Sequence, residues 1–175
     1  MRGQHTSHRV VTPTGPTLVA VNEHEAFGPI DPGEHPVDLG LTHVALPVQH
    51  WEETIEFYAE FAAMEVVHER GEPGERVAWI SDRTRPFVVV LLERSVDHRL
   101  GGWSHLGVGL ESRRAVDETL ARATEAGFDS LGPFDAGPPV GYWGMIADPN
   151  GHNLEVAHGQ EVGITVESTE SGRAG

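Results

Sequence analysis

The chain has 175 residues, a formal charge of −15 and no cysteine, and all 12 of its basic residues are arginines. This composition excludes disulfides, thiolate nucleophiles, sulfur-ligated metals and lysine imine chemistry. A chain this acidic is also a poor partner for nucleic acid or an anionic membrane, so we expect neither. No apolar run approaches the roughly 20 residues of a membrane span, and the first residues lack the apolar centre of a secretory signal. We therefore expect a cytoplasmic protein.

The two ends of the chain differ from its centre. Residues 1–40 are rich in proline, glycine, threonine and histidine and show no helical or strand period, which predicts an extended N-terminal arm. Residues 164–175 predict a disordered tail. The folded part is then a single domain over residues 41–163.

Within this domain, hydrophobic periodicity predicts the same series of elements twice. The first series is a strand, a helix and three strands, over residues 41–48, 50–64, 65–70, 76–82 and 86–93. The second is a strand, a helix and three strands, over residues 103–110, 112–127, 128–134, 141–148 and 152–158. Ser112 is the expected N-cap of the second helix, and Gly127 its expected stop.

The repeat predicts an α+β fold of two tandem βαβββ modules, at about 41–95 and 103–160. Neither module is large enough to bury its own sheet, so we expect the two to share a core. Glu93 follows His43 by the same number of residues as Glu155 follows His105, as expected for a duplication.

Each module begins with a strand that carries a histidine. Alternate residues of a strand face the same way, so His43 points with Ala45, and His105 with Gly107, away from the apolar residues that pack on the helices. A single histidine of this kind is usually a satisfied core residue. Two at equivalent places in a duplicated fold favour metal ligation.

The segment "DPNGHNLEV" reads as a tight turn followed by a strand. Glu155 lies on the strand face opposite Leu154 and Val156, where it is either a rim carboxylate or a ligand. With His43 and His105 it makes a set of two histidines and one carboxylate, which leaves positions open for water, substrate or dioxygen. We expect His152, of opposite parity, to point outward.

These features together resemble the vicinal oxygen chelate superfamily, which includes glyoxalase I, extradiol dioxygenases, epimerases and fosfomycin and bleomycin resistance proteins. The resemblance rests on the paired βαβββ units, the two histidines, "EFYAEF" in the first helix and the "DPNGHNLE" turn. It implies curved sheets that form an open, barrel-like cleft, with one divalent metal ion per chain held by His43, His105 and Glu155. The family also implies a small-molecule substrate and a candidate homodimer.

The resemblance leaves three functions open. An Fe(II) extradiol dioxygenase-like oxygenase is favoured, because three ligands are evident and a fourth is not; His98 and Tyr142 are its candidate catalytic residues. A glyoxalase I-like lyase, epimerase or isomerase, with nickel, zinc, cobalt or manganese, would use Glu93 as a fourth ligand, and Glu93 or Glu155 as the proton-transfer base. The family's usual pattern laid on "VLLE" instead puts Val90 at the ligand position and leaves Glu93 as a rim carboxylate. A protein that sequesters a drug or metabolite is the third. Fosfomycin is disfavoured, because the lysine expected for its phosphonate is missing.

Overall fold

The structure is a computed structural model and describes residues 40–171. The predicted order of elements, βαβββ twice, is observed. The first module consists of β1 (His43–Val48), α1 (Trp51–Ala62), β2 (Glu65–Arg70), β3 (Val77–Ser81) and β4 (Val88–Glu93). The second consists of β5 (His105–Gly109), α2 (Arg113–Glu125), β6 (Ser130–Gly137), β7 (Gly141–Ala147) and β8 (Asn153–His158), and α3 (Val162–Ser171) follows it.

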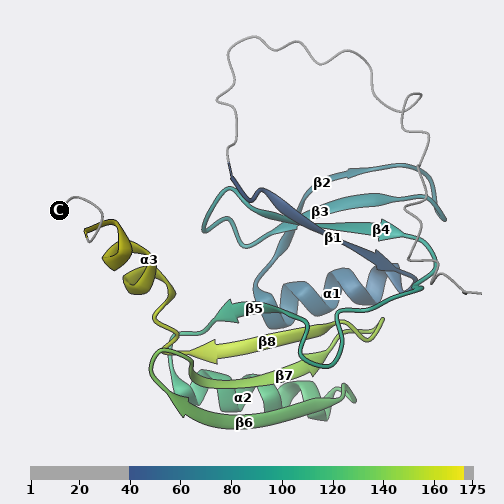
Figure 1. Ribbon diagram of the computed structural model, residues 1–175. Helices are drawn as coiled ribbons and strands as arrows, with labels where there is room; N and C mark the ends of the chain where they lie inside the picture. The colour runs from purple at the N-terminus through teal and green to yellow at the C-terminus, as the bar shows by residue number, and fades with distance from the viewer. Residues whose placement is uncertain (1–39, 172–175) are drawn as a thin grey trace, which may run out of the picture. The chain divides into compact units, whose positions relative to one another are not determined.

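The two modules have the same sheet topology (Figure 1). One sheet has the strand order β1-β4-β3-β2, and the other has the order β5-β8-β7-β6. In each sheet the first and last strands of the module pair in parallel, and the other pairs are antiparallel. Neither sheet closes on itself. The predicted α+β fold of two open βαβββ modules is confirmed.

Both predicted boundaries of the second helix are observed. The Ser112 hydroxyl accepts a hydrogen bond from the Ala115 N–H at 3.0 Å and so caps α2. Gly127, just after the helix, has a φ of +89°, a conformation that glycine adopts at little cost. None of the helices in the described part of the chain combines the length and the apolar character needed to cross a bilayer.

The described residues include most of the predicted tail but almost none of the predicted N-terminal arm. The predicted arm lies outside the described residues except for Gly40. The tail that we expected to be disordered from residue 164 is helical as far as Ser171, because α3 runs from Val162 to that residue. The Glu161 N–H donates to the Pro139 carbonyl at the β6–β7 turn, and the Thr165 N–H donates to the Glu161 carbonyl, so the helix starts from an anchored residue.

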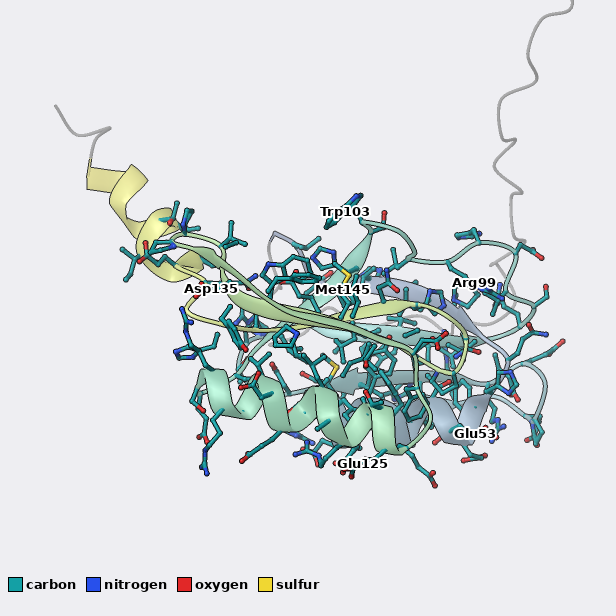
Figure 2. All side chains as sticks on the ribbon, turned by 90° about the horizontal axis from the view of Figure 1, so that it is seen from below. Glu53, Arg99, Trp103, Glu125, Asp135 and Met145 are labelled. Carbon is teal, nitrogen blue, oxygen red and sulfur yellow. The ribbon has the colours of Figure 1, made fainter. Side chains whose placement is uncertain are left out.

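The modules share one hydrophobic core, as the repeat predicted. Phe57 and Phe61 of α1 make ring contacts with Phe128, which follows α2, at centroid distances of 5.1 and 5.7 Å. An ion pair between Arg122 and Glu60 joins α2 to α1 at 3.0 Å. In Figure 2 both helices lie on one side of the sheets. The opposite face of each sheet is therefore the one left open to solvent.

A turn of the second module holds the start of the first helix. The side-chain oxygen of Asn150 accepts hydrogen bonds from the backbone N–H groups of Gln49 (2.8 Å) and His50 (3.2 Å). Its amide nitrogen donates to the Thr54 hydroxyl at 2.7 Å. His50 occupies the N-cap position, but its own ring makes no capping hydrogen bond. Asn150, which is distant in sequence, satisfies these backbone groups instead.

His152 does not point outward, as we had expected, but is buried at the junction of the modules. Its Nδ1 accepts a hydrogen bond from the Leu100 N–H at 3.1 Å, so the ring hydrogen is on Nε2, which donates to the Pro47 carbonyl at 2.9 Å. Asp148 accepts hydrogen bonds from the N–H groups of Asn150 and His152 at 2.8 Å each. The turn is thus a buried polar clamp between the modules.

We expect Asn150→Ala to lower the free energy of unfolding by about 1–3 kcal/mol, because the substitution uncaps α1 and leaves part-buried donors without their partner. Urea denaturation of the purified protein measures this loss. His50→Ala, at the same helix start, is the matched control and should cost less than about 0.5 kcal/mol, because the exposed ring caps nothing. Equal losses in the two variants would contradict the capping role of Asn150.

Candidate functional site

The first strand of each module presents its histidine on the open face of its sheet. In β1, Leu46 and Val48 are buried in the core, whereas His43 and Ala45 are exposed. In β5, His105 and its alternate neighbours are likewise exposed. This is the alternation that the sequence predicted.

Glu155 lies on the same open face as His105. In the sheet it pairs with Gly107 of β5 on one side and with Met145 of β7 on the other, so their side-chain positions share a face. Its neighbours in β8, Leu154 and Val156, are fully buried in the core on the other face. Glu155 is itself only 6% exposed, which is unusual for a carboxylate and calls for specific partners.

The imidazole ring of His105 lies between the Trp103 carbonyl and the Glu155 carboxylate. The His105 Nδ1 lies 2.8 Å from the Trp103 carbonyl oxygen, which can only accept, so this nitrogen carries a hydrogen. In the neutral ring Nε2 then has a free lone pair, and it lies 3.5 Å from Glu155 Oε2. Two acceptors face each other, which is favourable only if a proton or a metal cation lies between them.

The donor set fits a divalent metal ion. An imidazole nitrogen and a carboxylate oxygen both suit Fe(II), Zn, Ni, Co and Mn. Two ligand atoms that each lie about 2.1 Å from one ion are roughly 3.0–3.4 Å apart, close to the observed separation. The Trp103 carbonyl would orient the imidazole from behind, as the outer partners of metal-binding histidines do.

His43 does not join this pair within one chain. Its ring is exposed, and its Nδ1 hydrogen bonds to the neighbouring Thr42 hydroxyl at 3.0 Å. Across residues 40–171, no three histidine, aspartate or glutamate side chains come close enough to hold a metal ion. The structure therefore brings together two of the three expected ligands.

Glu93 lies at a different part of its sheet from the position that corresponds to Glu155. In the first sheet the residue two positions after the histidine, Ala45, pairs with Val90, whereas the equivalent Gly107 pairs with Glu155. The counterpart of Glu155 is therefore Val90. Glu93 pairs instead with the end of β1, on the face that packs on the core.

The carboxylate of Glu93 is held by Arg76. The guanidinium donates from Nε to Oε2 at 2.8 Å and from Nη2 to Oε1 at 2.9 Å, and the Gly74 N–H also donates at 2.8 Å. These hydrogen bonds, Arg76 first, lower the pKa of Glu93 to about 2. Such a carboxylate is only a weak base at neutral pH.

Tyr142 and His98 are not brought to His105 and Glu155. The Tyr142 hydroxyl donates to Asp117 of α2 at 2.7 Å, an interaction that raises the pKa of the tyrosine, and the Arg113 guanidinium covers its ring. Tyr142 thus lies on the helix side of the sheet. His98 is exposed in the segment between β4 and β5.

Aromatic side chains flank Glu155 on the open face. Trp143 is the strand neighbour of Ala157, two residues beyond Glu155, and its ring contacts those of Phe134 (4.9 Å) and Trp103 (6.4 Å). The indole N–H of Trp143 is buried and has no hydrogen-bond partner in the described part of the chain. Figure 2 shows Trp103 on the side of the sheet away from α2.

One residue of the site was missed by the sequence analysis. Gln160, two residues beyond β8, donates a hydrogen bond from Nε2 to Glu155 Oε1 at 2.6 Å. It belongs to no periodic element and to no motif, so no signal in the sequence marks it.

Residues 40–156 match the family described as the Glyoxalase/Bleomycin resistance protein/Dioxygenase superfamily. The chain belongs to this superfamily. The match spans both modules and includes His43, His105 and Glu155, and the resemblance seen in the sequence is thereby confirmed.

Three similar proteins align with about 70% of this chain. The chain is 35% identical over 127 residues to the uncharacterized protein PA2024 of Pseudomonas aeruginosa. The aligned region covers 70% of this chain and 91% of that protein. A possible glyoxalase from Bacillus cereus has the same fold, with 23% identity and a TM-score of 0.56 over 69% of this chain and 99% of that one. So does a mutant of FosX, a fosfomycin resistance protein from Listeria monocytogenes, in complex with Mn(II) and 1S,2S-dihydroxypropylphosphonic acid (20% identity, TM-score 0.56, 69% and 93% covered).

The lowered pKa of Glu93 predicts a pH dependence of stability. A depressed carboxylate pKa stabilises the fold above the ordinary value of 4.5, and this contribution is lost as the pH falls toward about 2. Glu93→Gln should therefore unfold at a lower temperature than the parent at pH 7, and the gap should close between pH 4.5 and 2. Thermal unfolding measures the gap, and metal binding by this variant should stay unchanged. Loss of metal binding would return Glu93 to the site.

Proposed function

We propose that this superfamily member is a metal-dependent enzyme whose cation is held by His105 and Glu155 of one chain and by His43 of a second copy. The observation that carries the proposal is that Nε2 of His105 faces the buried Glu155 carboxylate at 3.5 Å, while its Nδ1 is held by the Trp103 carbonyl. When the ring is neutral, two acceptors face each other, and a metal cation between them would satisfy both.

The open faces support a contribution from a second copy. On the face that carries His43, Trp79 is 42% exposed, and on the face that carries His105, Trp103 is 80% exposed. Exposed aromatic side chains on such a face are typical of a surface that another chain or a ligand covers. Closing the two kinds of face against each other would bury these residues and bring His43 toward His105.

The three-ligand set favours an oxygenase of the extradiol dioxygenase-like kind. The counterpart of Glu155 in the first module is Val90, which offers no fourth ligand. A divalent cation in such a site supplies Lewis acidity toward two neighbouring oxygens of a small substrate and, where it is Fe(II), the means to use dioxygen. Phe134 and Trp143 would stack on a planar substrate and keep water out, and a substrate oxygen could accept from the unpaired indole N–H of Trp143.

A glyoxalase I-like lyase or isomerase is the second candidate. Of the residues that an oxygenase would use to move protons, Tyr142 is engaged by Asp117, and His98 is exposed between β4 and β5. Proton transfer would then fall to Glu155, the carboxylate on the open face. A drug- or metabolite-sequestering protein would need the aromatic face without the metal.

The metal content separates these functions. We expect about one iron per chain after purification without air or chelator, its loss in His105→Ala, and dioxygen uptake with catechols. One nickel, zinc, cobalt or manganese per chain, without dioxygen uptake, would support the lyase or isomerase. If neither the parent nor His105→Ala binds any of these metals, the enzyme proposal fails and the sequestering function stands.

A shared site predicts complementation between two inactive variants. In a symmetric dimer of one His43→Ala and one His105→Ala chain, one of the two sites keeps all three ligands. Mixing equal amounts of the variants after dissociation should therefore restore metal to about a quarter of the sites, since about half of the dimers are hybrids. Each variant alone should bind none. A mixture that stays empty would contradict a site shared between copies.

A further inference from the structure

The two oxygens of the Glu155 carboxylate have different partners. Oε2 faces His105 Nε2 at 3.5 Å, whereas Oε1 accepts the hydrogen bond from Gln160 Nε2 at 2.6 Å. The amide must present its nitrogen here, because a carboxylate oxygen only accepts. Gln160 is half-buried and Glu155 almost fully buried, so solvent competes little with this hydrogen bond.

The backbone around Gln160 is arranged so that its side chain can reach Glu155. The segment after β8 passes very close to the start of β7 at Gly141. A Cβ at Gly141 would lie 2.4 Å from the His158 carbonyl oxygen and 3.0 Å from the Gln160 nitrogen, and the φ of this glycine is +86°. Just beyond, the Glu161 N–H donates to the Pro139 carbonyl at 3.1 Å. Only glycine permits this crossing.

We propose that Gln160 is a positioning residue of the metal centre, an inference that rests on the proposed function and deepens it. Its amide occupies Oε1 and leaves Oε2 as the one carboxylate oxygen turned toward His105. A comparison with Glu93 shows that a neutral donor preserves the negative charge of the carboxylate it binds. Arg76 neutralises the charge of Glu93, whereas an amide orients Glu155 and leaves its full negative charge for a cation.

This role has a consequence for metal preference. A carboxylate that offers one oxygen suits small ions such as Mn²⁺, whereas Ca²⁺ has longer bonds, higher coordination numbers and often takes both oxygens of one carboxylate. Freeing Oε1 should therefore weaken the binding of Mn²⁺ more than that of Ca²⁺. General damage to the site would weaken both ions alike.

The test compares Gln160→Leu with the parent and with Glu161→Gln, a matched control one residue away with an exposed side chain. Full-length, metal-free protein is titrated with Mn²⁺ and with Ca²⁺ by calorimetry, and thermal unfolding is recorded for each variant. We expect Gln160→Leu to lose 10- to 100-fold in Mn²⁺ affinity, about the range for outer partners of metal ligands. Its Ca²⁺ affinity should change less than about 3-fold and its unfolding temperature little. Glu161→Gln should match the parent.

Equal Mn²⁺ affinity in Gln160→Leu and the parent would overturn the proposal, and so would an equal loss of both ions. If the parent binds no divalent ion, the proposed function itself fails. The metal-free protein then still tests the contact, because the side-chain amide proton of Gln160 should resonate downfield and return to the ordinary position in Glu155→Ala. An ordinary amide resonance in the parent would overturn the role of Gln160 on its own.

Discussion

The buried hydrogen bonds of the turn from Asp148 to His152 determine how the two modules meet, and the open faces of the sheets follow from that arrangement. Asn150 satisfies the first backbone groups of α1, and His152 bridges Pro47 and Leu100. Each of these polar groups is costly to leave unpaired in a buried place, so the modules cannot slide without losing several hydrogen bonds at once. The helices then pack together on one side, and the faces that carry the two histidines point away from the shared core.

The same turn serves the site as well as the junction. β8 begins immediately after it, and the alternation of the strand puts Leu154 and Val156 in the core and Glu155 on the open face. A rigid, buried turn is a suitable support for a side chain whose direction matters. One short segment therefore joins the modules and supplies the carboxylate.

The two modules have the same topology but different chemistry. The second provides an imidazole and a carboxylate that face each other, whereas the first offers His43 with Val90 in the corresponding strand position. Glu93, the acidic residue of β4, is paired with Arg76. This asymmetry agrees with the proposed centre assembled from unlike modules, in which the second module would supply the carboxylate.

The sequence by itself determined the elements, the duplication and the strand face on which His43 and His105 lie, because these depend on local periodicity. It could not determine strand register. The equal spacing from His43 to Glu93 and from His105 to Glu155 suggested that Glu93 corresponds to Glu155, whereas the family pattern suggested Val90, and only the pairing between strands selects Val90. Nor could it reveal that His152 is buried or that Gln160 holds Glu155, because these contacts join segments through a turn or a crossing that no pattern encodes. Only the tertiary structure decided these points, since pairing and packing between distant residues select one arrangement among several that satisfy the same local preferences.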